Sequence, residues 1–139
     1  MSRSDMRQLL QEHGVLPTPQ RLEVADVLLG RPQHLSAEQI IEKLKSAGSR
    51  VSKATVYNTL KLFGECGIVR EVMVDPVRKF YDSTTHRHHH FYNVDTGELS
   101  DIAVDKVRFK SLPNLPEGTT EQGVEVLIRI RNADEGPAR

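Results

Sequence analysis

Cysteine, tryptophan and aromatic residues are scarce in this sequence. The single cysteine, Cys66, excludes an internal disulfide and any zinc site that needs two thiolates from one chain, so we expect it to be a small buried hydrophobe. Tryptophan is absent and aromatic residues make up only 5% of the 139 residues, which disfavours a large substrate cavity.

Long apolar segments are also missing. No run of about 18 apolar residues is present, and residues 1–5 lack the apolar stretch of a signal peptide, so we expect a cytoplasmic protein with no membrane partner. The formal net charge of zero argues against non-specific binding to polyanions, but a whole-chain sum hides how charge is distributed. With 37% hydrophobic residues, the chain can form one compact domain or two small ones.

The first half contains start and stop signals for four helices. Residues 4–13 form the first, and Thr18 with Pro19 begins a second that ends near Gly30. Ser36 and Gln39 form a capping box for the third. Ser52 caps the fourth, which runs to about residue 64 with Val56, Leu60 and Phe63 at core spacing. A hairpin follows, with strands at 68–74 and 77–82. Helices followed by a hairpin predict a winged helix-turn-helix over residues 1–83.

The second half has a strand-like pattern. Strands are expected at 91–94 and 99–104, joined by a turn at 95–98, and apolar residues alternate from Val124 to Ile130. This indicates a small, mainly β domain over residues 84–139 whose core is thin, so we expect a homodimer. The predicted fold class is α+β, a winged helix-turn-helix followed by a small α/β dimerisation domain.

One face of the fourth helix carries Lys53, Tyr57, Asn58 and Lys61. This face suits a recognition helix in a DNA major groove, where the lysines meet phosphates and the other two side chains reach base edges. An ordinary solvated amphipathic helix is the alternative, and the following hairpin favours the first interpretation.

Histidine is concentrated at His86, His88, His89 and His90. In a strand, His88 and His90 point to one face and His89 to the other, so the His-x-His pair can give two imidazole nitrogens to one metal ion. Asp82 and Asp101 lie near the ends of flanking strands and could complete a site without sulfur. Such ligands suit iron, manganese or zinc and disfavour copper(I). A fortuitous surface tract and a pH-sensing cluster are the alternatives.

The whole chain resembles the ferric uptake regulator family. The matching stretches are Thr18-Pro19-Gln20-Arg21, His34-Leu35-Ser36-Ala37-Glu38, Ala54-Thr55-Val56-Tyr57-Asn58-Thr59-Leu60 and residues 88–97. The resemblance implies a dimer on double-stranded promoter DNA, with Arg21, Lys53, Thr55, Tyr57, Asn58 and Lys61 as the DNA-binding residues. It also implies a regulatory divalent iron or manganese ion, with zinc as a substitute in vitro, whose ligands come from both halves and are His34, Asp82, His88, His90 and Asp101.

Two departures from the family pattern are informative. Many members have a Cys-x-x-Cys structural zinc pair where this chain has Asn93 and Thr96, so no structural four-cysteine zinc is expected. An arginine often follows the recognition-helix tyrosine, but this chain has Asn58 there. The operator sequence therefore cannot be carried over from the family.

Two branches of the family share features with this chain. The three-histidine run and the ending from Leu115 resemble the iron response regulator branch, which answers to haem and controls iron homeostasis; His86 and His89 are then candidates for a haem contact or a secondary metal. Asp82 and Asp101 resemble the peroxide-sensing branch, which represses oxidative stress genes. The first branch is the favoured interpretation, although this chain lacks an N-terminal Cys-Pro haem motif.

Two other classes of protein compete with a metal-responsive regulator. A non-haem iron enzyme could use two histidines and a carboxylate, but it leaves the first 80 or so residues unexplained, so no enzymatic activity is expected. A metal-independent winged-helix regulator leaves the histidine cluster unexplained.

Overall fold

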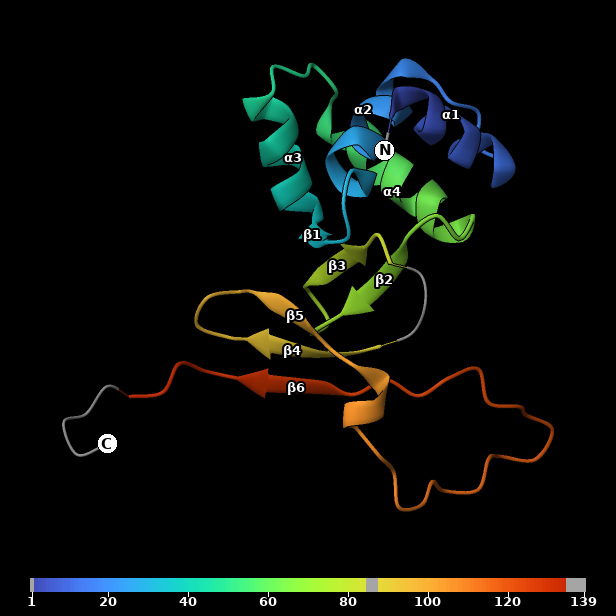
Figure 1. The fold of residues 1–139 in the computed structure, drawn as a ribbon, viewed down its shortest axis with the longest axis vertical. Helices are drawn as coiled ribbons and strands as arrows, with labels where there is room; N and C mark the ends of the chain where they lie inside the picture. The colour runs from blue at the N-terminus through green and yellow to red at the C-terminus, as the bar shows by residue number, and fades with distance from the viewer. Residues whose placement is uncertain (1, 85–87, 135–139) are drawn as a thin grey trace. The chain divides into compact units, whose positions relative to one another are not determined.

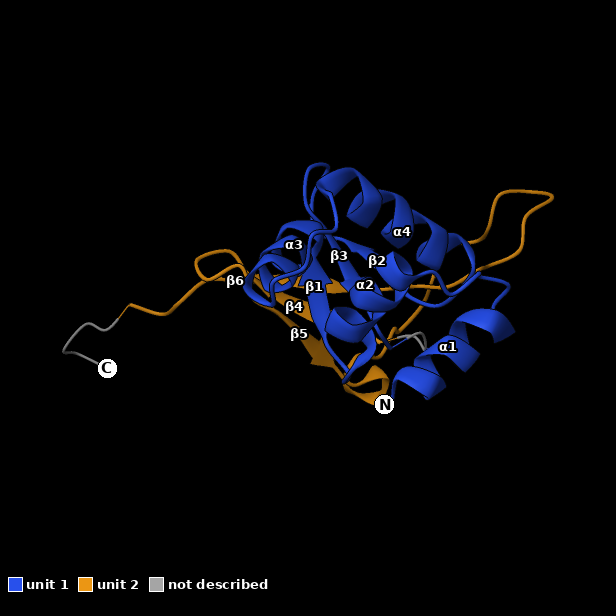
Figure 2. Ribbon diagram, turned by 90° about the horizontal axis from the view of Figure 1, so that it is seen from above, with its two compact units in different colours: residues 1–85 blue, residues 86–139 orange. Residues whose placement is uncertain are grey.

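The computed structural model describes residues 2–84 and 88–134. The chain divides into two compact units, residues 1–85 and 86–139, which are coloured separately in Figure 2. Helices and small sheets make it an α+β protein, as predicted. None of the helices in the described part is long and apolar enough to cross a membrane.

Four α-helices form most of the first unit, and each begins where the sequence carries a capping residue (Figure 1). The side chains of Ser2, Thr18, Ser36 and Ser52 each accept a hydrogen bond from a backbone N–H in the first helical turn. The predicted capping box is present, because Gln39 in turn accepts from the Ser36 N–H at 2.9 Å. The helices are α1 (Arg3–Glu12), α2 (Pro19–Leu29), α3 (Ala37–Ser46) and α4 (Lys53–Glu65).

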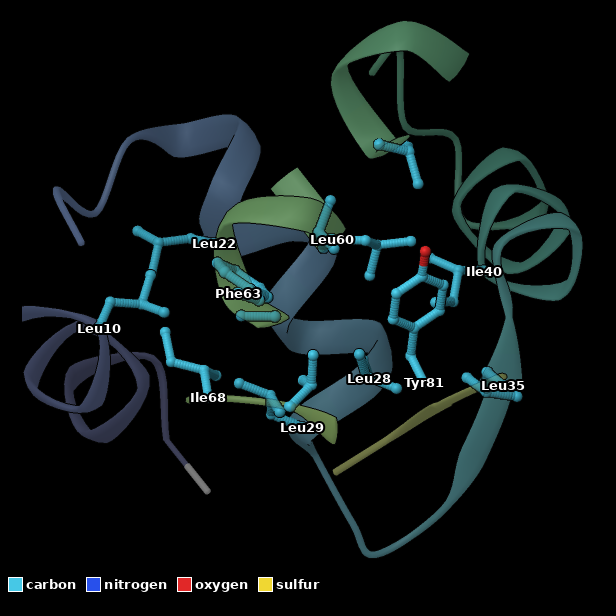
Figure 3. Packing of buried hydrophobic residues seen from close by; sticks show 14 of the residues in the cluster. Leu10, Leu22, Leu28, Leu29, Leu35, Ile40, Leu60, Phe63, Ile68 and Tyr81 are labelled. Atoms are coloured by element: carbon cyan, nitrogen blue, oxygen red, sulfur yellow. The ribbon is translucent and has the colours of Figure 1, made fainter. Parts of the chain in front are cut away.

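The core of the first unit lies between these helices (Figure 3). Leu60 and Phe63 of α4 are fully buried, and Val56 almost so, which confirms the core face predicted for this helix. They pack with leucines of α1 and α2 and with Ile40 of α3. Because α4 is anchored by one face, its opposite face is left to solvent, with Tyr57 45% exposed.

A three-stranded sheet completes the first unit. Strands β2 (Arg70–Met73) and β3 (Lys79–Asp82) form the predicted hairpin, and β1 (His34–Ser36) pairs with β3 on its other side. The sequence did not predict β1, because three residues ending at a helix cap show no strand periodicity. Leu35 of β1 is buried opposite Tyr81, so tertiary pairing rather than local propensity forms this strand.

The second unit is built on a sheet in the order β5-β4-β6. Strand β4 (His89–Asn93) lies in the middle, antiparallel to β5 (Leu99–Ile102) and parallel to β6 (Leu127–Ile130). The one helical segment among its described residues is the 3-10 turn η1 (Val104–Lys106). Residues 107–126 form no helix or strand and run out from the sheet before returning to β6 (Figure 1).

Hydrogen bonds of Asn93 and Thr96 hold the turn between β4 and β5. Asn93 Oδ1 accepts from the N–H groups of Asp95 and Thr96 at 2.9 and 3.1 Å, and Thr96 Oγ1 accepts from the Glu98 N–H. Asn93 Nδ2 donates to Asn132 beyond β6 at 2.9 Å. The side chains of Asn93 and Thr96 therefore stabilise this turn by hydrogen bonds.

We expect Ser36→Ala to lower the free energy of unfolding of the apo protein by about 1 kcal/mol, because the Gln39 N–H loses its acceptor at the start of α3. Ser46→Ala is the matched control, since Ser46 is exposed at the far end of the same helix. Urea unfolding followed by helical circular dichroism measures both. Equal stability of the two variants would contradict the role given to the cap.

Candidate metal centre

The first unit places a histidine and an aspartate opposite each other at the edge of its sheet. His34 of β1 pairs in register with Asp82 of β3, and His34 Nε2 lies 3.7 Å from Asp82 Oδ2. Asp82 is almost fully buried, while the His34 side chain is 12% exposed. This separation is too long for a hydrogen bond, but an ion with bonds of about 2.0–2.2 Å to each atom fits between them.

The neighbouring residues fix this pair. Gln33 and Ser83 exchange hydrogen bonds across the strands, from the Gln33 N–H to Ser83 Oγ at 3.0 Å and from the Ser83 N–H to the Gln33 carbonyl at 3.1 Å. The Gln33 side chain donates to the carbonyls of Val27 and Leu28 at the end of α2. The position of His34 is therefore tied to the helical core.

The second unit brings together two histidines and one carboxylate. Nε2 of His88 lies 2.8 Å from Oδ1 of Asp101, and Nε2 of His90 lies 3.4 Å from the same oxygen. His90 and Asp101 are opposite each other in the β4–β5 register, and the two imidazole rings are 4.5 Å apart. Both histidines are buried, whereas the Asp101 side chain is 52% exposed.

These donor sets fit a divalent ion. Two imidazole nitrogens and a carboxylate oxygen that converge within 4.8 Å of one another match the nitrogen and oxygen ligands of iron, manganese and zinc. Sulfur is not part of either set, because Cys66 packs against the hydrophobic core of the first unit, although it is partly rather than fully buried.

His89 points away from His88 and His90, as strand alternation predicts. Its Nδ1 accepts a hydrogen bond from the Val126 N–H at 2.8 Å, and its ring forms a T-shaped contact with the ring of Phe109. A backbone N–H can only donate, so Nδ1 carries the lone pair and the neutral ring has its proton on Nε2. His89 thus holds the start of β6 against β4, and His86 lies outside the described residues.

The predicted DNA-binding residues fall into two groups. Lys53, Tyr57, Asn58 and Lys61 are exposed on the free face of α4. The other two are half-buried and engaged within the protein: Arg21 donates to the Leu16 carbonyl at 2.9 Å, and Thr55 accepts from the Ser52 hydroxyl at the α4 cap. The exposed four are therefore the more accessible members of the predicted set.

Glu38 is a neighbour of this face to which the sequence alone assigned no role. The Tyr57 hydroxyl donates to Glu38 Oε1 at 3.0 Å, and this hydrogen bond raises the pKa of Tyr57. Burial raises the pKa of a second tyrosine, Tyr81, which lies on β3. An acid in the first turn of α3 was visible in the sequence, but its pairing with α4 depends on how the helices pack.

Known proteins share this architecture. Residues 12–122 match the ferric uptake regulator family. The ferric uptake regulation protein of Vibrio cholerae is 34% identical over 106 residues, which is 75% of this chain and 71% of that protein. The peroxide-responsive repressor of Staphylococcus saprophyticus is 33% identical over 67% of this chain, and the match spans only 63% of the repressor's length.

Solved structures agree with the sequence matches. The crystal structure of the Vibrio cholerae regulator, which revealed a rearrangement of its DNA-binding domains, aligns with a TM-score of 0.72 at 25% identity, covering 91% of this chain and 98% of that one. The regulator of Pseudomonas aeruginosa with manganese has the same fold, with a TM-score of 0.69 at 24% identity over 93% of this chain and 98% of that one. The chain belongs to the ferric uptake regulator family.

Proposed function

We propose that this protein is a metal-responsive transcriptional regulator that binds promoter DNA as a homodimer. The observation that carries the proposal is the convergence of His88 and His90 on one oxygen of Asp101. It occurs in a chain that belongs to a family of transcriptional regulators. Three neutral or anionic donors in this arrangement are suited to a cation rather than to a substrate. We expect no enzymatic turnover.

We propose further that one ion is shared by ligands from both units. Each unit alone offers an incomplete set, His34 and Asp82 in the first and His88, His90 and Asp101 in the second. Iron and manganese usually take more ligands than either set supplies, so joining the sets completes the coordination. Only residues 83–87 separate Asp82 from His88, which limits the distance between those two residues to about 20 Å whatever the arrangement of the units.

Iron(II) or manganese(II) is the proposed regulatory ion, with zinc as a substitute in vitro. The donor set is imidazole and carboxylate only, and the fold is shared with a regulator solved with manganese. Haem, which resemblance to the iron response regulator branch implied, has no support among the relatives described above. His89, one of its two candidate contacts, is engaged with Val126.

A shared ion would couple metal binding to DNA binding. Each metal bond between the units forms only in the arrangement that brings the two sets together, so the ion favours that arrangement over all others. To reverse a one-to-ninety-nine ratio between two arrangements of the units, the ion must bind one arrangement roughly 10⁴-fold more tightly than the other, a difference of about 5.5 kcal/mol. Bonds to two ligands of the second set can supply a free energy of that order.

We expect His90→Ala to abolish the effect of manganese(II) on operator binding and to weaken manganese affinity more than about 100-fold, because a direct ligand is lost. His13→Ala is the control for loss of an imidazole, since His13 lies at the end of α1 in the first unit. Calorimetry gives the affinity and gel-shift titration gives the operator response. An unchanged response in His90→Ala would rule out this ligand assignment.

We expect Lys61→Ala to weaken operator binding and to reduce the slope of log K against log salt by about 1, because one phosphate contact is lost. Tyr57→Phe should weaken binding with little change in slope, since no charge is removed. Lys110→Ala is the matched control, because this exposed lysine lies in the second unit. Identical slopes for Lys61→Ala and the control would exclude Lys61 from the phosphate contact.

Peroxide sensing is the second candidate, supported by 33% identity to a peroxide-responsive repressor. A metal-responsive regulator and a peroxide sensor are distinguished by measuring operator affinity with manganese(II) or iron(II), each with and without peroxide. A regulator that responds to the metal alone keeps its operator affinity in peroxide with either ion. Loss of binding only when iron and peroxide are both present would support the peroxide sensor instead.

A further inference from the structure

The contact between Glu38 and Tyr57 joins two helices on the exposed face described above. Tyr57 lies in the second turn of α4 with its hydroxyl 3.0 Å from Glu38 Oε1, and Glu38 lies in the first turn of α3. Both side chains are exposed, so neither is present to fill the core. The carboxylate is favourably placed next to the positive end of α3.

The direction of this hydrogen bond is fixed by chemistry. A carboxylate can only accept, so the Tyr57 hydroxyl must use its one proton toward Glu38. The raised pKa of Tyr57 has the same hydrogen bond as its main cause. The phenolic oxygen then has only lone pairs to offer to a third group, and Tyr57 can accept a further hydrogen bond but cannot donate one.

We propose that Glu38 is a specificity-determining residue that makes Tyr57 an acceptor toward DNA. In the major groove, hydrogen-bond donors are found only on the amino groups of adenine N6 and cytosine N4, whereas guanine and thymine present acceptors at the corresponding edge. Tyr57 therefore selects adenine or cytosine on the strand that it contacts. This inference rests on the proposed DNA binding and adds to it which edge of a base one side chain recognises.

A carboxylate at this position is otherwise unfavourable for binding a polyanion. Lys53 and Lys61 lie on the same helix as Tyr57, and a negative charge at Glu38 offsets part of their attraction for phosphate. Non-specific affinity would rise if Glu38 were neutral. Glu38 thus lowers the affinity for any DNA and at the same time makes Tyr57 an acceptor. Such a combination favours discrimination between base sequences over tight binding.

The test is selection of binding sites from a random DNA pool with the metal-loaded protein, followed by sequencing. Wild-type protein is expected to enrich adenine or cytosine at one position of each half-site, and Tyr57→Phe is expected to lose the preference at that position alone. Glu38→Ala frees the hydroxyl to donate, so guanine and thymine should become acceptable there and the preference should fall about tenfold.

Glu65→Ala is the matched control, because Glu65 is an exposed carboxylate at the end of α4 and its removal changes the net charge equally. It should raise overall affinity as Glu38→Ala does, but keep the base preference. A phenolate absorbance titration checks the contact itself. Glu38→Ala should lower the pKa of Tyr57, identified by comparison with Tyr57→Phe, and Glu65→Ala should not.

Three results would overturn the inference. They are a wild-type preference for guanine or thymine at the position that depends on Tyr57, the same preference in Glu38→Ala as in wild type, and a Tyr57 titration unaffected by Glu38→Ala. In each of these the wild-type protein still selects a sequence, so the proposed function stands. If metal-loaded wild-type protein enriches no sequence at all, the proposed function fails and the inference fails with it.

Discussion

In each of its two sheets, this protein pairs a histidine with an aspartate directly across antiparallel strands. His34 lies opposite Asp82 in the first sheet and His90 opposite Asp101 in the second. Strand register is therefore the constraint on which the proposed metal centre depends, because a slip of one residue turns every side chain of a strand to the other face. The Gln33–Ser83 exchange and the hydrogen bonds of the Asn93 turn hold the two registers.

Local signals in the sequence predicted much of the fold and part of the site. The caps at Thr18, Ser36 and Ser52 start helices through bonds within one turn, so they can be identified without tertiary information. Alternation along a strand likewise separated His89 from its neighbours. By contrast, β1 forms only because β3 lies beside it, and the Tyr57–Glu38 contact depends on how α3 and α4 pack. Neither leaves a periodic pattern to detect.

The proposed metal site was likewise predicted only in part from the sequence. Composition excluded a site with two thiolates from one chain, the histidine run indicated a metal, and the strand pattern pointed to Asp82 and Asp101 as possible partners. His34 lies far from them in the sequence and could be named only through resemblance to the family. The structure places each proposed ligand beside another of the set within its own unit. The proposed metal ligands lie on or next to strands, whereas the proposed DNA-binding face lies on α4, and residues 83–87 link the ligands of the first unit to those of the second.

We propose that ligands from both units bind one ion, and this is tested most directly by a crystal structure of the manganese(II)-loaded protein with the ion located by anomalous scattering. We expect one manganese ion per chain within bonding distance of His34, Asp82, His88, His90 and Asp101. An ion bound only by His88, His90 and Asp101, with His34 and Asp82 outside its coordination sphere, would contradict it.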